Sequence, residues 1–136
     1  MVPFAMSAVL LAGGGAATAV GTAGAAEPTA DEVSARSCYG SARNYTSAPG
    51  GPGGRNAHWP GTGRWAYATR NCADINVKVN HNRKVKVCWK RTGTCQRDWT
   101  NAKRGRWVAV ATNVRDGAGF YVQFRGVNRS TGKIAY

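Results

Sequence analysis

The chain has 136 residues, of which 19 are Lys or Arg and 6 are Asp or Glu, so its formal net charge is +13. This length accommodates one small domain and excludes a two-domain enzyme. The charge is concentrated in residues 37–136, which carry 18 basic and 3 acidic side chains, or +15. A domain with so few carboxylates forms few internal ion pairs and favours anionic partners.

Residues 1–26 contain no charged side chain and are predicted to be a secretory signal peptide. Their apolar centre is followed by small residues, and Ala23-Gly24-Ala25 fits the A-x-A pattern that precedes signal cleavage. We therefore expect a secreted, extracellular protein, and no later stretch is long and apolar enough to predict a transmembrane segment. Residues 27–37 are polar and predict a flexible N-terminal arm, with a strand added to a partner's sheet edge as the functional alternative. Residues 38–136 then form a single domain.

Four cysteines lie in the exported part of the chain, at positions 38, 72, 88 and 95. An even number of cysteines in an oxidising compartment predicts two disulfides, for which three pairings are possible. We favour Cys38–Cys72 together with Cys88–Cys95. There is no C-x-x-C motif, so neither a metal site nor a cofactor is expected.

Alternating apolar and polar residues predict an all-β domain. Residues 48–63 hold six Gly and three Pro, which predicts a long surface loop without helix or strand. Residues 96–104 could hold one helical turn. The predicted strands are 64–70, 74–80, 84–90, 107–112, 120–124 and 133–136. Six or seven short strands with Gly and Asn turns indicate a small antiparallel β-sandwich or a barrel.

The turn cluster Asn80-His81-Asn82 predicts a β-hairpin between the strands 74–80 and 84–90. In the second of these strands, Val85 and Val87 are expected to face inward. Cys88 shares the outward face with the lysines, so its partner should lie outside the core. Cys95 follows soon after Cys88 in the sequence, and the Cys88–Cys95 bond is therefore expected to close a short loop at the surface.

The search for catalytic residues argues against an enzyme. Cleavage of RNA needs two titrating groups that flank the phosphate, whereas His58 and His81 each lie in a predicted loop or turn with no residue to orient them. The exported domain beyond Cys38 offers only three Asp, too few for a carboxylate pair, and it contains no G-x-S-x-G motif. A small secreted ribonuclease is the least favoured of the functions considered.

Basic and aromatic side chains predict a binding surface. The outward lysines of the predicted hairpin continue into two arginines, which together suit an anionic partner. Trp65, Trp89 and Trp107 fall in strand registers and are expected in the core, whereas Trp59 and Trp99 are expected to be exposed anchors. The predicted partner-binding residues are Trp59, Trp99, Lys78, Lys84, Lys86, Lys90, Arg91 and Arg97.

The order of Cys38, Trp65-Ala66-Tyr67, Cys72-Ala73-Asp74 and a Val-Lys-Val strand resembles the tendamistat-type amylase inhibitors. The resemblance implies a small secreted actinobacterial β-sandwich with two disulfides, the first corresponding to Cys38–Cys72, in an immunoglobulin-like or tendamistat-like arrangement. It covers roughly residues 38–90. Ala66 stands where those inhibitors have the arginine of their Trp-Arg-Tyr turn, and the spacing from Cys38 is longer. The chain also resembles small cationic secreted proteins of actinobacteria more broadly.

These observations predict a non-enzymatic protein-binding module. It would act as an adaptor, a subunit of an extracellular complex or a hydrolase inhibitor, through loops, an edge strand or the N-terminal arm. Its partner would be a protein, and the positive charge would suit an acidic one. The alternative is a cationic protein that binds the anionic cell envelope or acts as an antimicrobial. Nucleic acid is not the expected partner, because export and the missing nuclease residues point elsewhere.

Overall fold

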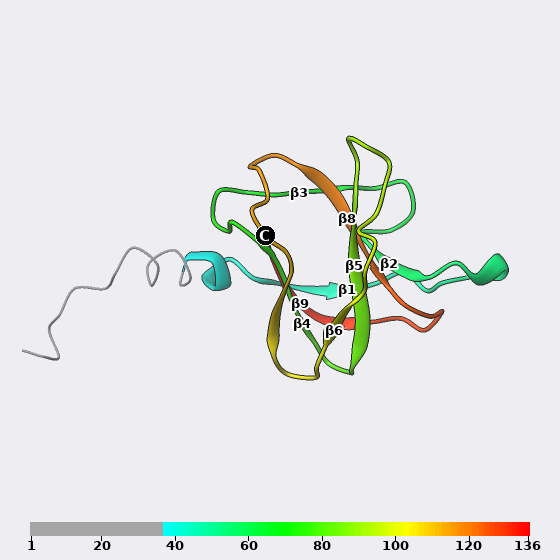
Figure 1. Cartoon of the computed structure of the whole chain (residues 1–136). Helices are drawn as coiled ribbons and strands as arrows, with labels where there is room; N and C mark the ends of the chain where they lie inside the picture. Colours follow the sequence, from blue (N-terminus) through cyan, green and yellow to red (C-terminus); the bar gives the residue numbers. More distant parts are fainter. Residues whose placement is uncertain (1–36) are drawn as a thin grey trace, which may run out of the picture. The chain divides into compact units, whose positions relative to one another are not determined.

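The computed structural model describes residues 37–136, so the predicted signal peptide and all but the last residue of the predicted arm lie outside the described residues (Figure 1). The described range contains nine strands in two antiparallel sheets that pack together. This confirms the predicted all-β sandwich with two disulfides. The sequence pattern predicts six strands with defined residues, and the structure contains three more.

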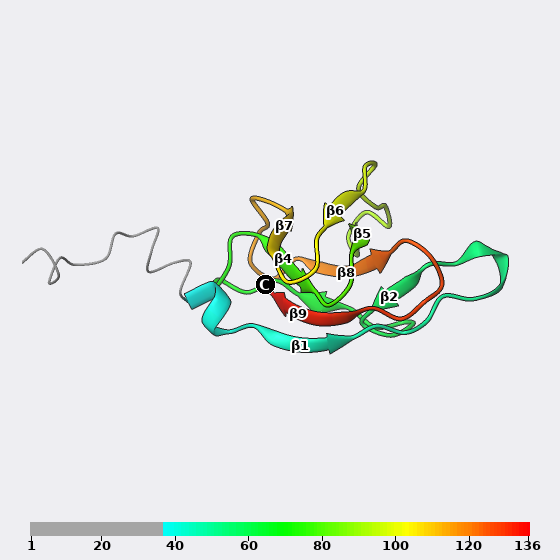
Figure 2. The same ribbon diagram turned by 90° about the horizontal axis from the view of Figure 1, so that it is seen from below.

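The strands divide into two layers, and Figure 2 shows β1 and β9 along one side with β5 and β6 on the other. In spatial order, the first sheet consists of β1 (Arg43–Thr46), β9 (Thr131–Ala135), β4 (Ile75–Val79) and β7 (Trp107–Ala111). In the same way, the second consists of β2 (Ala57–Trp59), β8 (Gly119–Phe124), β5 (Arg83–Trp89) and β6 (Thr100–Ala102). A two-residue strand, β3 (Ala66–Tyr67), pairs with the start of β8.

The core lies between the two sheets and follows the period-two pattern of the strands. In β8, Phe120, Val122 and Phe124 are fully buried, while the residues between them are half-buried. Val85 and Val87 of β5 are also fully buried, as predicted. Each such side chain contributes roughly 1.5–3 kcal/mol of burial free energy, so this stripe is the main apolar support of the second sheet.

The predicted hairpin between 74–80 and 84–90 is wrong. β4 pairs with β7 and β9 in the first sheet, whereas β5 pairs with β6 and β8 in the second. Residues 80–82 therefore cross from one sheet to the other. Asn80 remains tied to the first sheet, because its backbone N–H and its side-chain amide each donate a 2.9 Å hydrogen bond to Thr131. Turn-forming residues reverse the chain, but they do not decide which strands then pair.

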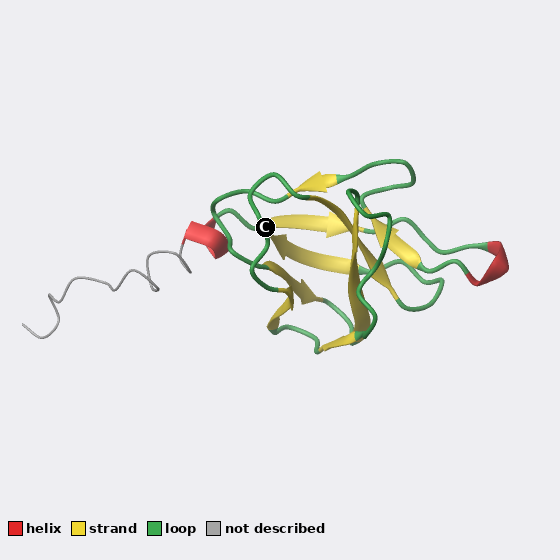
Figure 3. Cartoon of the chain, turned by 45° about the horizontal axis from the view of Figure 1, so that its top comes forward, coloured by secondary structure: helices red, strands yellow, loops and turns green. Residues whose placement is uncertain are grey.

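Three other local predictions need correction. The Gly/Pro-rich segment 48–63 does contain a strand, β2, because Ala57 is fully buried and its N–H donates to the Gly126 carbonyl. The rest of that segment includes a 3-10 turn, Pro52–Gly54, at the tip of a projecting loop (Figure 3). Residues 96–104 hold the strand β6 instead of a helical turn. Of the predicted strand 64–70, only Ala66–Tyr67 forms.

Both disulfides have the preferred pairing, Cys38–Cys72 and Cys88–Cys95. The second closes a loop of sequence separation 7, and the two cysteines also form an isolated antiparallel bridge. Cys95 is half-buried and lies outside the core, as predicted, but Cys88 is 2% exposed and belongs to the buried apolar residues, so its expected position on the outward face is wrong. The loop that the bond closes folds back on β5, since Gln96 N–H donates to the Val87 carbonyl.

A buried polar network fixes β1 to the connection that precedes β9. The Tyr45 hydroxyl hydrogen-bonds Ser130 Oγ at 2.9 Å, and Ser130 N–H donates to Ser47 Oγ at 2.8 Å. Burial raises the pKa of Tyr45 to about 12, while the Ser130 hydrogen bond and the nearby Arg83 charge act in the opposite direction. Burial also lowers the pKa of Arg83, against the effect of Tyr45. Burial thus favours the neutral form of Tyr45, even though the hydrogen bond with Ser130 acts in the opposite direction.

Candidate functional site

The predicted lysine face is divided by the topology of the sandwich. Lys78 is on β4 in the first sheet, whereas Lys84 and Lys86 are on β5 in the second. Lys78 Nζ lies 6.0 Å from the centroid of Trp107, its neighbour in the register of the first sheet. The prediction that these lysines form one face of a hairpin is therefore wrong, because no hairpin joins their strands.

Four residues lie together on the outside of β5 and β6, namely Lys86, Arg97, Asp98 and Trp99. Lys86 Nζ lies 4.4 Å from the centroid of the Trp99 ring, close enough for a cation–π interaction. Arg97 Nε is 3.8 Å from Asp98 Oδ1, and both side chains are almost fully exposed. This is the only ion pair among residues 37–136, and a pair in that setting contributes little to stability.

The tryptophans are placed differently from the prediction. Trp59 and Trp99 are half-buried and not exposed. Trp59 packs against the main core, with its ring centroid 6.4 Å from that of Tyr45. Trp89 also packs against the main core, as expected. Trp65 does not belong to the core: its ring meets Tyr121 edge to face at 5.4 Å, at the surface.

Lys90 and Arg91 lie at a hollow that the sequence pattern does not indicate, here called the cationic groove. It has a volume of about 670 Å³ and runs between the loop that follows β5 and the loop that joins β7 to β8. Its apolar lining comes from the half-buried Trp89, Val114 and Ala118, which also pack against the main core. Its charged lining residues are Lys90, Arg91, Arg115 and Asp116.

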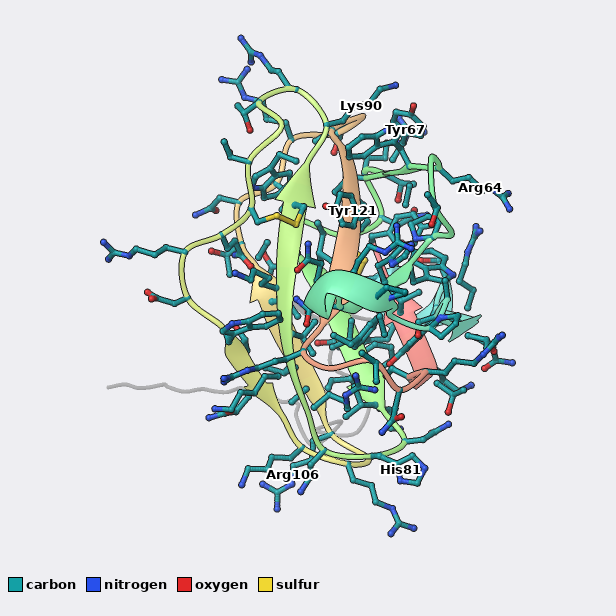
Figure 4. All side chains as sticks on the ribbon, turned by 90° about the vertical axis from the view of Figure 1, so that its right-hand side faces the viewer. Arg64, Tyr67, His81, Lys90, Arg106 and Tyr121 are labelled. Atoms are coloured by element: carbon teal, nitrogen blue, oxygen red, sulfur yellow. A yellow bond between two sulfur atoms is a disulfide. The ribbon has the colours of Figure 1, made fainter. Side chains whose placement is uncertain are left out.

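One end of the cationic groove is held by Tyr67 and Lys90, which lie side by side in Figure 4. Lys90 Nζ donates a 2.7 Å hydrogen bond to the Tyr67 hydroxyl. Lys90 N–H donates to the Gly119 carbonyl at 2.9 Å, so the residue is fixed at its backbone as well. A Cβ at Gly119 would lie 3.0 Å from Lys90 Cβ and 3.2 Å from the Tyr67 ring, so the glycine permits this close approach.

The opposite wall, residues 112–118, is also held by hydrogen bonds. Val114 N–H donates to the Ala73 carbonyl at 2.8 Å, and Asn113 N–H donates to Asp74 Oδ1 at 3.3 Å. Gly117 N–H donates to the Ala68 carbonyl at 2.7 Å. With the Cys88–Cys95 bond on the other side, both walls are ordered before any partner binds, which lowers the entropic cost of association.

The two histidines do not form a catalytic pair. His58 belongs to β2 and lines a hollow beside Arg64 and Tyr121. His81 lies in the connection between the sheets, at the opposite end of the molecule from Arg64 in Figure 4. Two groups this far apart cannot flank one phosphate. Among residues 37–136, no three His, Cys, Asp or Glu side chains lie close enough together to hold a metal ion.

None of the helices formed by residues 37–136 has the length and apolar character needed to cross a membrane. No family model, curated protein or solved structure matches this chain. The resemblance to tendamistat-type inhibitors therefore stays a prediction. The structure places Trp65-Ala66-Tyr67 at and beside the edge strand β3, with Ala66 buried and Tyr67 48% exposed.

Sequence reasoning missed Tyr67, Val114 and Arg115 as residues that share a hollow with Lys90. Tyr67 and Lys90 belong to the predicted strands 64–70 and 84–90, and nothing in either pattern indicates that both strands lie next to the same segment, β8. The run Val114-Arg115-Asp116-Gly117 lies between the predicted strands 107–112 and 120–124, where Asp116-Gly117 is typical of a turn. An apolar residue followed by a charge within a turn was the one local signal available.

Proposed function

We propose that this chain is a non-enzymatic protein-binding module that takes an acidic segment of an extracellular partner into the cationic groove. The observation that carries the proposal is the combination of an apolar floor with three cationic residues at one preformed hollow. An apolar side chain of the partner would cover Trp89 and Val114, and neighbouring carboxylates would meet Lys90, Arg91 and Arg115. Interfaces gain most of their affinity from such a central apolar contact, while the charges at the rim raise the association rate.

The wide distribution of positive charge supports this class of partner. Apart from the exposed Arg97–Asp98 contact, the cations of residues 37–136 have no acidic side chain within 4 Å. Asp116 is the one carboxylate of the groove lining. An acidic partner would thus be attracted over a long range, and we expect the association rate to fall steeply as ionic strength rises.

A photo-crosslinking amino acid at Thr92 tests the groove directly. Thr92 is exposed and lines the groove, while Asn101, the matched control position, is exposed on β6. The crosslinker at Thr92, but not at Asn101, should capture a protein from culture medium through an acidic peptide. Capture should fall at least fivefold in Arg91→Gln and Arg115→Gln, and change less than twofold in Arg104→Gln. Equal capture at both positions, or a chain recovered alone from the medium, contradicts the proposal.

Attachment to an anionic cell-envelope surface is the second candidate, and the scarcity of ion pairs favours it. In that case the charge would act without a defined groove. Co-sedimentation with vesicles that contain an anionic lipid should then weaken by the same factor in Arg91→Gln and Arg104→Gln. A preferential loss in Arg91→Gln would instead support the groove.

A further inference from the structure

The loop over residues 60–65 separates two hollows that lie apart from the cationic groove. Arg64 and Trp65 line both of them. The first hollow, of about 210 Å³, lies toward His58 and Tyr121. The second, of about 290 Å³, lies toward Trp59 and Tyr136. Two adjacent hollows that share one aromatic side chain are suited to consecutive units of a chain-like ligand.

The first hollow combines an aromatic pair with several hydrogen-bonding groups. Trp65 and Tyr121 meet at 62°, which leaves ring surface of the half-buried Trp65 available. His58 Nδ1–H donates to the Asn56 carbonyl at 3.2 Å, so its Nε2 accepts from the Thr62 hydroxyl at 3.0 Å. Its lining therefore places the hydroxyls of Thr62 and Tyr121 and the amide of Gln123 around an aromatic surface, a combination that suits a ring with several hydroxyl groups.

The second hollow repeats the combination of aromatic rings and a guanidinium. The rings of Trp59 and Tyr136 lie 5.9 Å apart. The Arg43 guanidinium lies 5.4 Å from the Tyr136 ring centroid, so it is held near this aromatic pair. Arg43 comes from β1 and Trp59 from β2, so the hollow is formed where one edge of each sheet meets the loop.

Positive charge follows the same path as the aromatic rings. Arg55 lines the first hollow, Arg43 lines the second, and Arg64 lines both. No Asp or Glu is among the residues that line either hollow. All three arginines are exposed, and none forms an ion pair within residues 37–136. Guanidinium groups bind carboxylates through two parallel hydrogen bonds, so these three arginines suit a ligand that carries several acidic groups.

We propose that these two hollows bind a linear polysaccharide that contains uronic acid, with consecutive pyranose rings on either side of Trp65. The C–H groups of a pyranose face meet the negative face of an aromatic ring favourably. Each hollow is smaller than the roughly 300–1,000 Å³ of a pocket for a drug-sized ligand, so each accepts one ring. The inference is independent of the function assigned to the cationic groove, which shares none of these lining residues.

Titration calorimetry with a hexamer of galacturonic acid tests the proposal on the complete chain. The methyl ester of the same hexamer provides the uncharged control, and it should bind at least tenfold more weakly. Trp65→Ala and Arg64→Gln should each weaken binding of the acidic hexamer at least tenfold. The matched control is Arg106→Gln, which removes an exposed arginine at the opposite end of the molecule and should change the affinity less than twofold (Figure 4).

Three results would overturn the inference. Equal losses in Arg64→Gln and Arg106→Gln would show that only net charge attracts the hexamer. An oligothymidylate of about twelve nucleotides that binds more tightly, and loses its affinity in Trp65→Ala, would assign the hollows to single-stranded nucleic acid, for which bases stack on aromatic rings. Absence of binding at low ionic strength by a chain with the wild-type circular dichroism spectrum would also contradict it. None of these results depends on whether a protein occupies the cationic groove.

Discussion

Lys90 Nζ donates a 2.7 Å hydrogen bond to the Tyr67 hydroxyl and lies 5.1 Å from the centroid of the same ring. The pair joins the end of β5 to the short edge strand β3 across β8, and it forms one end of the cationic groove. Both side chains are exposed, and Tyr67 is 48% exposed. The pair therefore shapes the groove more than it stabilises the fold.

Lys90→Met tests whether the Lys90–Tyr67 pair serves the groove or the stability of the fold, because the substitution keeps most of the aliphatic stem and removes the charge. Exposed polar and cation–π contacts contribute under about 1 kcal/mol, so the free energy of unfolding in urea should change by less than that amount. Partner capture by the crosslinker at Thr92 should nevertheless fall at least threefold. A loss of more than about 2 kcal/mol would show that the pair is part of the structural core.

The two disulfides are expected to contribute unequally to stability. Cys38–Cys72 has a sequence separation of 34, and Cys88–Cys95 has a separation of 7. Loop-closure entropy in the unfolded chain then gives about 4 kcal/mol for the longer loop and about 2.5 kcal/mol for the shorter one. Urea unfolding of the paired variants Cys38→Ala/Cys72→Ala and Cys88→Ala/Cys95→Ala measures both values.

A greater loss from the shorter loop would contradict the entropic account. It would indicate that Cys88 acts chiefly through its burial, since it is 2% exposed. Hydrogen exchange provides a second readout. In Cys88→Ala/Cys95→Ala, the exchange rate of Gln96 N–H, which donates to the Val87 carbonyl, should rise. The Ser130 N–H, which donates to Ser47 Oγ, should stay protected.

Several of the strands that the sequence predicts well have buried apolar residues in alternation. β4, β5 and β8 each bury three or more side chains, so their period is visible in the sequence. β1 and β6 bury only Tyr45 and Ala102, respectively, and these single positions leave no period to detect. Such strands form because an adjacent strand offers its backbone groups, which is a tertiary effect.

The candidate site was predictable only in part, for a topological reason. Local pattern correctly placed Lys84 and Lys86 outside the core, but it assumed that β4 pairs with β5. Because 80–82 crosses between sheets, Lys78 belongs to another surface. Lys90 shares the cationic groove with Tyr67 and Arg115, which come from distant segments. These relationships depend on which strands pair over long sequence separations, and turn chemistry does not specify that pairing.

Gly132 is expected to tolerate no side chain. It lies in β9 with a φ of +158°, between Tyr45 of β1 and Val79 of β4. A Cβ there would overlap the Lys78 carbonyl oxygen and lie 3.0 Å from Tyr45 Cε2. Gly132→Ala should therefore lower the free energy of unfolding by about 3 kcal/mol, as overpacked sites do. Thermal unfolding measures the loss.

Gly40→Ala is the matched control for this substitution. A Cβ at Gly40 would have no other atom within 4 Å, and its backbone is not in the left-handed region. The change in unfolding free energy should stay within about 0.5 kcal/mol, as is usual for surface substitutions. Equal stability of the two variants would show that the first sheet can shift to admit the added methyl group.

The buried hydroxyl of Tyr45 should make the domain sensitive to alkali. Its pKa is raised by burial from 10.0 to about 12, so the unfolded chain ionises this group at a lower pH than the folded chain does. The resulting stabilisation is complete below pH 10 and is lost as the pH rises through about 12. Two pKa units correspond to roughly 3 kcal/mol.

Tyr45→Phe isolates this contribution, because the ring that stacks on Phe124 at 5.2 Å is retained and only the hydroxyl is lost. Near pH 8 the variant should be about 1 kcal/mol less stable than the wild type, since Ser130 loses a hydrogen-bond partner. Between pH 10 and 12, Tyr45 ionises in the unfolded wild type but stays neutral in the folded wild type, which lowers the free energy of unfolding of the wild type alone. The order of stability should therefore reverse. Rapid urea unfolding after a pH jump, completed before alkali attacks the disulfides, measures both curves. A constant difference from pH 8 to 12 would show that Tyr45 ionises equally readily in the folded and unfolded chains.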